Sequence, residues 1–276
     1  MRTGLVMGQQ RMSWSEVVRR ARYTESGGFD NWWGFDHFQP MYGEGPGECF
    51  EAYTTLAALA GQTDSVRLGV LVTGVTYRHP SVLATELVTI DHASAGRAEF
   101  AVGSAWFEPE HRALGIDFPP LPERIRMLDE ALTIIRGLMT TDSFSFDGEH
   151  WQLDKATIFP RPVQDPHVPV WVAAKGAHSI QVAAKHADVW HAPVPVGEAV
   201  ALSATVTEAI DRFGRDPGSV RRAASVDLSQ PFDGVRANVE RLRAAGFDTV
   251  LFGWPSEGEA WLDQFIEQVL PEVAAD

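Results

Sequence analysis

The sequence predicts a (β/α)8 barrel, an α/β fold in which eight parallel strands alternate with eight helices. Short apolar, often β-branched runs alternate with longer amphipathic runs along the chain. Such alternation implies a parallel sheet, and eight pairs in 276 residues match the size of a barrel. The alternative is a doubly wound open sheet, which usually carries a G-x-G-x-x-G turn after its first strand. Here Gln9 to Met12 follows that strand, so the barrel is favoured.

In the first half of the chain, capping and turn residues mark the ends of the elements. Ser13 and Glu16 form a capping box for a helix that Gly27 and Gly28 end. Pro80 suits the first turn of another helix. The expected strands are residues 5–7, 29–35, 66–72 and 98–102, and the helices after the capped one are residues 52–60, 82–90 and 123–139.

The second half continues the alternation after one insertion. Phe144 to Leu153 alternates around Asp147 and Gly148, which predicts a β-hairpin outside the main pattern. Residues 103–122 are expected to form a long loop. No domain boundary is visible, so we expect one domain over residues 1–276. The expected strands are residues 168–173, 189–192, 223–228 and 249–252, and the helices are residues 179–186, 198–213, 235–245 and 261–269.

The composition is that of an ordinary globular protein with an acidic surface. Hydrophobic residues make up 45%, charged residues 22%, and the net charge is −14. That charge disfavours binding to nucleic acid or to anionic membranes. Cys49 is the one cysteine, so no internal disulfide can form, which fits a reducing compartment. No signal peptide or apolar run of about 18 residues occurs, so we expect a cytoplasmic protein with a small-molecule substrate.

Functional side chains in a barrel lie where strands end and the following loops begin. Asp36 and His37 follow the second expected strand. An imidazole there can exchange a proton near neutral pH, and the carboxylate can bind a ligand or tune the charge of the site. An ordinary surface Asp–His pair at the start of a loop is the alternative.

Small residues follow two further strands. Residues 173–177 (Ala-Ala-Lys-Gly-Ala) would let backbone N–H groups approach an anion at a helix N-terminus, and Lys175 adds a full charge. Residues 103–106 (Gly-Ser-Ala-Trp) suit a flat ring system, with Trp106 as a wall. Tight packing explains both segments as well, since the chain holds nine tryptophans.

Metal and serine-hydrolase motifs are absent from the sequence. The histidines are scattered, and neither H-x-H nor H-E-x-x-H occurs. Glu108, Glu110 and His111 lie close together, but we expect a solvated loop or helix start there. No G-x-S-x-G is present. We therefore expect no catalytic metal and no nucleophilic serine elbow.

A set of short motifs in a fixed order covers most of residues 2–192. The motifs are Gly28-Phe29-Asp30, Asp36 to Pro40, Arg67 to Thr73, Tyr77 to Pro80, Ala95-Gly96-Arg97, Gly103 to Trp106, Glu110 to Ala113, Phe146-Asp147-Gly148, Phe159 to Gln164 and Ala187 to Trp190. With this set the sequence resembles the luciferase-like monooxygenase superfamily, and most closely the branch that uses the deazaflavin coenzyme F420. Each motif is weakly specific, whereas the ordered set is specific; beyond residue 195 only the strand-helix rhythm matches.

The resemblance implies a barrel, usually a homodimer, with the cofactor ring at its C-terminal mouth. It places a backbone bulge, often with a non-prolyl cis peptide, at Leu71–Val72 behind the ring. It also implies that residues 174–177 hold the cofactor phosphate. The implied cofactor-binding residues are Asp36, Leu71, Val72, Thr73, Ser104, Ala105, Ala174, Lys175, Gly176 and Ala177.

The implied function is hydride transfer between coenzyme F420 and an unknown organic substrate. A 5-deazaflavin carries the hydride, while the protein supplies orientation and a proton source, for which His37 is the expected catalytic residue. An FMN-dependent monooxygenase of the same superfamily is one alternative. A non-redox barrel, either a lyase or a ligand-binding protein, is the alternative from another class. The loop from Asp36 to Gly47, with three glycines, is a candidate lid.

One position departs from the family pattern. In members that oxidise sugar phosphates a Glu stands at the fourth strand mouth, where this sequence has Trp106. We therefore expect that general acid to be missing and the substrate pocket to be broader and apolar. Strand alternation lets only about half of the strand tryptophans face inward. The residues expected in the substrate pocket are Trp106, His191 and Trp254, with Trp32, Trp33 and Trp190 as further candidates.

Overall fold

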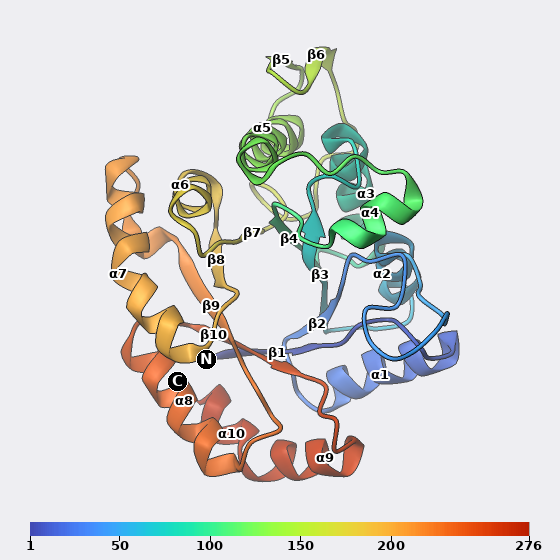
Figure 1. Ribbon diagram of the computed structural model, residues 1–276, viewed down its shortest axis with the longest axis vertical. Coiled ribbons are helices and arrows are strands. Elements are labelled where there is room, and N and C mark those ends of the chain that lie inside the picture. Colours follow the sequence, from blue (N-terminus) through green and yellow to red (C-terminus); the bar gives the residue numbers. More distant parts are fainter. Residues whose placement is uncertain (276) are drawn as a thin grey trace.

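Eight parallel strands close into a barrel at the centre of the molecule (Figure 1), in a computed structural model that describes residues 1–275. The predicted fold class is therefore confirmed. Neighbouring strands around the barrel are β1 (Arg2–Val6), β10 (Thr249–Gly253), β9 (Arg221–Val226), β8 (Val189–Ala192), β7 (Val170–Ala173), β4 (Ala98–Gly103), β3 (Arg67–Gly74) and β2 (Asn31–Gly34), which pairs with β1 again.

Helices surround the barrel, and eight of them match the expected positions. They are α1 (Trp14–Ser26), α2 (Ala52–Ala60), α3 (Pro80–Ala93), α5 (Leu121–Thr140), α6 (Ala177–His186), α7 (Val196–Arg212), α8 (Phe232–Ala244) and α9 (Glu259–Gln268). The expected helix ends are confirmed where capping residues mark them. Ser13 Oγ accepts the N–H of Glu16 at 3.3 Å, and Gly28 and Gly246 have φ angles of +82° and +79° just beyond α1 and α8.

Two short α-helices were not expected, nor was a 3-10 helix at Pro217–Ser219. Residues 103–122 are not one long loop, because α4 (Glu108–Leu114) forms within them. Pro109 lies in its first turn and Gly115 ends it with a φ of +68°. The last helix, α10 (Leu270–Ala274), follows α9 and has Pro271 in its first turn. Proline at these places starts a helix, whereas the sequence pattern there indicated only an interruption.

The predicted hairpin is confirmed and stands outside the barrel, at the top of Figure 1. Strand β5 (Phe144–Asp147) pairs antiparallel with β6 (Gln152–Ala156). The carboxylate of Glu130 on α5 accepts the backbone N–H groups of Glu149 and His150 at 2.8 and 3.0 Å. The hairpin is therefore attached to α5 by its turn.

Apolar side chains fill the barrel interior and the layer between barrel and helices. Trp33 and Trp171 meet edge to face inside the barrel, with ring centroids 4.8 Å apart. A Cβ on Gly69 would lie 2.2 Å from the Trp33 ring, so glycine makes room for the indole. Trp32 and Trp190 belong to the outer layer. The expected division of the strand tryptophans between the two sides is therefore confirmed.

Among residues 1–275, every helix is too short or too polar to cross a lipid bilayer.

Candidate active site

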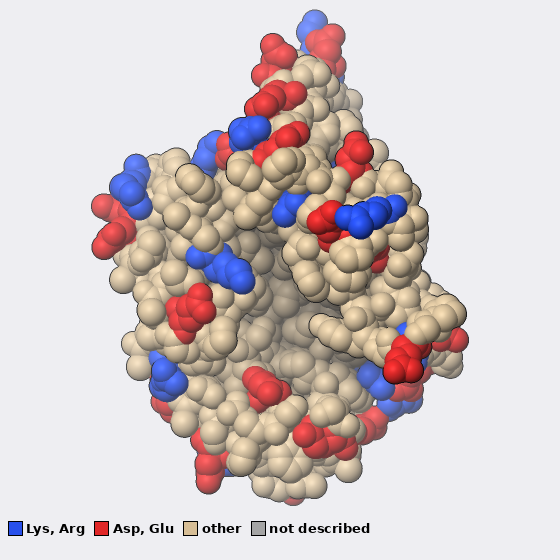
Figure 2. All heavy atoms as spheres, viewed as in Figure 1, with Lys and Arg blue, Asp and Glu red and all other residues tan. Residues whose placement is uncertain are grey.

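A cavity of about 590 Å³ opens at the C-terminal mouth of the barrel, and Figure 2 shows this face hollowed at its centre. Its walls come from the loops after β2, β3, β4 and β7 and from α5. Sites for small molecules usually have this size and occupy this end of a barrel. The predicted residues that line it are Asp36, His37, Val72, Ser104, Ala105, Trp106, Lys175, Gly176 and Ala177.

Five predicted site residues do not line this cavity: Leu71, Thr73, Ala174, His191 and Trp254. Thr73 is buried beneath it, with its hydroxyl 2.6 Å from that of Tyr53. The carbonyl of Ala174 accepts the indole N–H of Trp190 at 2.8 Å, so it points away from the mouth.

Trp254, which the sequence predicted in the substrate pocket, lies outside this cavity. Its ring packs against α1, with the guanidinium of Arg20 4.2 Å and the ring of Tyr23 5.5 Å from it. Strand alternation ends at Gly253, so the sequence could not fix the direction of the next side chain.

His191 lies inside the barrel rather than on the cavity wall. Its side chain is almost fully buried, Nε2 lies 3.5 Å from Ser225 Oγ, and Nδ1 has no hydrogen-bond partner. Burial lowers the pKa of His191 to about 4. The ring is therefore neutral near pH 7 and forms part of the layer beneath the mouth.

The floor of the cavity is built from small residues around a backbone irregularity. Leu71–Val72 is a cis peptide bond, as predicted, and the β3–β4 register shifts between Val70 and Thr73. A Cβ on Gly103 would lie 3.2 Å from Val72 Cγ2, so the two strand ends approach closely there. Val72, Gly103 and Ala105 therefore give this part of the cavity a lining of small or apolar side chains.

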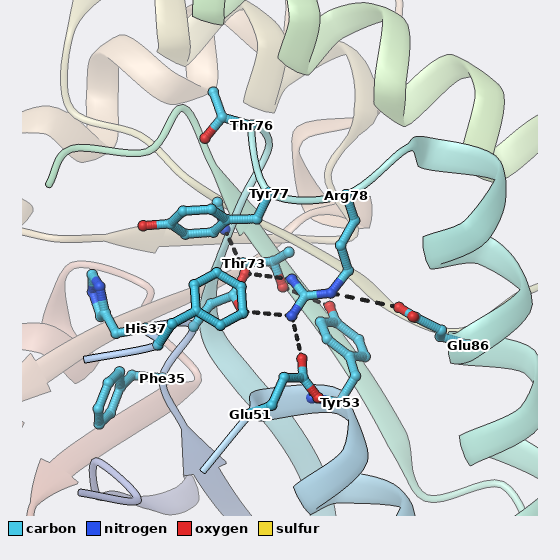
Figure 3. Close-up of polar contacts among 12 residues, drawn as sticks. Phe35, His37, Glu51, Tyr53, Thr73, Thr76, Tyr77, Arg78 and Glu86 are labelled. Carbon is cyan, nitrogen blue, oxygen red and sulfur yellow. Dashed lines mark hydrogen bonds and ion pairs between the residues drawn. The ribbon is translucent and has the colours of Figure 1, made fainter. Parts of the chain in front are cut away.

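Asp36, at the wall of the cavity, belongs to a buried ion-pair network centred on Arg78, which Figure 3 shows with Glu51 and Glu86. Arg78 donates from Nη1 and Nη2 to the two oxygens of Asp36, at 2.8 and 3.0 Å, and the N–H of Gly74 donates at 3.0 Å. Arg78 also contacts Glu51 and lies 3.7 Å from Glu86. These donors occupy the carboxylate of Asp36, so its observed contacts fix the loop after β3.

His37 faces the cavity and contacts a buried carboxylate. Its Nδ1 lies 3.1 Å from Oε2 of Glu110, whose side chain is completely buried. The hydroxyl of Tyr77 donates to the same oxygen at 2.6 Å. Burial by itself would raise the pKa of Glu110, but hydrogen bonds from His37, Tyr77 and two backbone N–H groups hold it below its usual value.

The expected helix start is confirmed, since α4 begins at the exposed Glu108, but the expectation that Glu110 and His111 are solvated was wrong. Both Glu110 and His111 are fully buried, because α4 packs these two positions toward the strand ends. The partners of Glu110 lie 33 to 73 residues away in the chain, so no local pattern could identify them.

The start of α6 lies at the cavity, where the sequence predicted an anion-binding corner. The first bond within the helix runs from the N–H of Ile180 to the carbonyl of Gly176, at 2.9 Å. The N–H groups of residues 177–179 therefore lie ahead of the intrahelical ladder, and these residues line the cavity beside Lys175. Partial positive charge at a helix N-terminus and a lysine suit a phosphate group.

Arg124 is a cavity-lining cation that the sequence pattern did not single out. Its guanidinium lies 3.7 Å from the ring of Phe118 and donates to the carbonyls of Ser104 and Pro119 at 2.9 and 2.7 Å. Burial lowers the pKa of Arg124. In the sequence Arg124 is one of several charged positions on the helix at 123–139. Its place at the barrel mouth results from the packing of α5 against the strands.

The loop from Asp36 to Gly47, the candidate lid, is tied to the loop after β1. Arg11 donates from Nε to the carbonyl of Tyr42 at 2.6 Å and from Nη2 to that of Gly45 at 2.5 Å. These bonds hold the loop against the loop after β1, and of its residues Asp36 and His37 line the cavity.

Comparison with known proteins gives the family. A sequence model of the luciferase-like monooxygenase family matches residues 1–245. The chain belongs to this family. An F420-dependent glucose-6-phosphate dehydrogenase of Kineococcus radiotolerans is 31% identical over 218 residues, which are 78% of this chain and 64% of that protein. An FMNH2-dependent dimethylsulfone monooxygenase of Pseudomonas putida is 29% identical over 192 residues, which are 68% of this chain and 52% of that protein.

The luciferase-like chain thus spans about half to two thirds of the length of these two relatives. A solved structure, an F420-dependent secondary alcohol dehydrogenase with an F420-acetone adduct, superimposes with a TM-score of 0.85. It covers 100% of this chain and 99% of its own, at 20% identity. That likeness supports the barrel fold over its whole length.

Proposed function

We propose that this luciferase-like protein is an F420-dependent oxidoreductase that transfers a hydride between the deazaflavin and an organic alcohol or carbonyl compound. One observation carries the proposal: a floor of small or apolar side chains, a helix N-terminus beside a lysine and an imidazole backed by a carboxylate all line the same cavity. When bound, the deazaflavin would supply two-electron chemistry, in which it accepts or donates a hydride.

The residues present fit such a cofactor. The cavity of about 590 Å³ suits a tricyclic ring, and its floor at Val72, Gly103 and Ala105 carries no bulky side chain. Ala105 has a φ of +59°, a conformation that costs a residue with a Cβ roughly 1–2 kcal/mol and holds its small side chain at the mouth. The corner at Lys175 and the start of α6 would hold the phosphate.

His37 would handle the proton. Its ring lines the cavity, and Glu110 contacts Nδ1, which leaves Nε2 for the substrate. In alcohol oxidation the hydroxyl proton passes to His37 as the C–H bond gives up its hydride and the carbonyl forms. In carbonyl reduction the imidazolium returns the proton to the oxygen. General acid–base groups of this kind typically contribute about 10²- to 10⁴-fold to rate.

The choice of F420 over FMN rests on the relatives and on the phosphate corner. The F420-dependent relative is more similar than the FMNH2-dependent one, in both identity and share of this chain. Lys175 at the helix end suits the phosphodiester and the acidic tail of F420. FMN-dependent monooxygenation is the second candidate, because FMN would use the same floor and the same corner.

We infer further that the substrate carries no phosphate. Among the described residues, the cavity lining includes one lysine, Lys175, and one arginine, Arg124. Lys175 would bind the cofactor. The segments that follow β8, β9 and β10 (193–195, 227–231 and 254–258) contain no lysine or arginine, and the last two each contain one acidic residue. In Figure 2 the hollow is mostly uncharged. An uncharged alcohol or ketone therefore suits this mouth better than a sugar phosphate.

The homodimer, the cytoplasmic location and the single domain over residues 1–276 stay predictions of the sequence and are part of this proposal.

A titration of the purified protein tests the cofactor assignment. Fluorescence should report saturable binding of F420 at micromolar concentration or below, and weaker binding of FMN. FMN binding without F420 binding would favour the second candidate, and no binding of either would support a non-redox barrel. With F420 bound, a simple secondary alcohol such as cyclohexanol should reduce the cofactor faster than glucose 6-phosphate does; the opposite order would contradict the substrate class.

A further inference from the structure

We propose that Glu110 is the positioning residue for His37: it accepts the Nδ1 proton and so leaves Nε2 of the imidazole free to exchange a proton with the substrate. The catalytic use of Nε2 rests on the proposed function. The orientation and tautomer of the ring do not, since they follow from contacts within the chain. His37 is 13% exposed and Glu110 is completely buried, so the imidazole stands between the carboxylate and the cavity.

The hydrogen bonds around Glu110 assign a role to every partner. Its Oε1 accepts the backbone N–H groups of Phe38 and Gln39 at 2.7 and 2.9 Å, and these groups can only donate. Its Oε2 accepts the hydroxyl of Tyr77 at 2.6 Å. An ionised carboxylate has no proton to offer, so Nδ1 of His37, 3.1 Å from Oε2, must donate as well. The bond at one ring nitrogen decides which tautomer is present.

The carboxylate is held so that it cannot turn away from the ring. The next residue, His111, is also fully buried; its Nε2 lies 2.6 Å from Thr76 Oγ1 and its Nδ1 lies 2.9 Å from the carbonyl of Phe107. Its ring stacks on that of Tyr77 with centroids 4.5 Å apart. His111 therefore anchors α4 next to Glu110 against the loop after β3, and this contact helps to hold the carboxylate in place beside the imidazole.

Two consequences for proton transfer follow. A neutral His37 presents its Nε2 lone pair to the cavity and can act as a base. When it gains a proton, the new positive charge lies next to a buried carboxylate that stays ionised, because its pKa is held low. A carboxylate behind a catalytic histidine fixes the tautomer and stabilises the imidazolium in the same way in serine proteases.

Glu110→Gln separates positioning from packing. The two backbone N–H groups at Oε1 require an acceptor, so the amide oxygen of the new side chain should stay there. Its NH2 group then faces His37, and Nδ1 must accept instead of donate. The ring should change to the Nε2–H tautomer, which cannot take the substrate proton. Shape and volume are almost unchanged.

The experiment is nitrogen-15 NMR of the cofactor-free protein with labelled histidine, at a pH where His37 is neutral, with His37→Gln identifying the signal. Wild type should show the Nδ1–H tautomer and E110Q the Nε2–H tautomer. The matched control is Glu99→Gln, which alters another fully buried glutamate at the far end of the barrel and should leave the His37 signal unchanged. With F420 and a substrate, E110Q should lower kcat at least 100-fold, with KM and the F420 Kd changed less than about 5-fold.

The outcomes separate this inference from the proposed function. An Nε2–H tautomer in wild type, or the same tautomer in wild type and E110Q, overturns the positioning role. If E110Q does not fold, the wild-type spectrum decides, and Tyr77→Phe should keep the Nδ1–H tautomer because the carboxylate remains. If the tautomer changes as expected but neither F420 nor FMN binds, the positioning stands and the proposed function fails.

Discussion

Two buried glutamates lie at opposite ends of the barrel, and they differ in what binds them. Glu99 on β4 lies toward the N-terminal end, where Arg67 Nε donates to it at 2.5 Å and Trp171 Nε1 at 2.7 Å. Glu110 on α4 lies beyond the C-terminal end of β4 and contacts His37 and a tyrosine. Both carboxylates are at most 1% exposed.

The difference shows that burial of an acid does not by itself mark a functional site. The guanidinium and the indole N–H that bind Glu99 can only donate hydrogen bonds, so this carboxylate is a fixed part of the N-terminal end of the barrel. The partner of Glu110 is a titratable ring that lines a cavity, so that group can support a change of charge. In barrels the first end serves stability and the second serves chemistry.

The largest expected effect is at the mouth. His37→Ala should lower kcat by roughly 10²- to 10⁴-fold, because the substrate proton loses its acceptor, while the F420 Kd changes by less than about tenfold. Steady-state kinetics and a fluorescence titration measure the two quantities. Turnover at the wild-type rate would remove His37 from the catalytic role.

At the N-terminal end of the barrel we expect the opposite result, a loss of stability without a loss of turnover. Glu99→Ala should lower the free energy of unfolding by about 3 kcal/mol, because the guanidinium of Arg67 and the indole N–H of Trp171 lose their acceptor. Urea unfolding measures this loss, and the turnover of the folded fraction should stay within about twofold. Lost turnover with unchanged stability would break the distinction between the two ends.

Between the two ends, His191 should give stability a pH dependence. Its native pKa of about 4 lies below the unfolded value, so the unfolded chain takes up a proton as the pH falls from 6.5 to 4 and the native state does not. Stability should be greatest above pH 6.5 and fall by up to about 1.4 kcal/mol for each pH unit below it. In His191→Leu this contribution should vanish from urea unfolding curves at pH 7 and pH 5. An equal pH 7 to pH 5 difference in both proteins would show that His191 is not buried neutral.

The smallest effect is expected at the rim. Lys175→Ala removes one charge from the phosphate corner while the N–H groups of residues 177–179 remain, so the F420 Kd should rise about tenfold. The turnover number at saturating F420 should change little. An unchanged Kd would argue against the corner, whereas a lost turnover number with normal binding would give Lys175 a chemical role.

The sequence predicted the barrel well because its evidence is local and periodic. Each strand and helix carries its own pattern, and caps such as Ser13 and Gly246 fixed several boundaries. Helix α4 escaped because a proline between two glutamates gives no apolar face to detect. Whether such a segment forms a helix depends on its contacts with distant parts of the chain, which a local pattern does not contain.

The candidate site was predicted less completely. The motifs pointed to His37 and Lys175, which do meet at one cavity. They could not indicate that Glu110 is buried behind His37, because 73 residues separate the two. Nor could they indicate that Trp254 packs against α1 and not along this cavity, because it follows a strand end, where alternation no longer determines direction.

A crystal structure of the protein with F420 tests the central claim most directly. The account predicts the deazaflavin ring on the floor formed by Val72 and Gly103, the phosphate at Lys175 and the start of α6, and His37 Nε2 facing the reactive face of the ring. A ring bound elsewhere, or a phosphate far from residues 175–177, would contradict it.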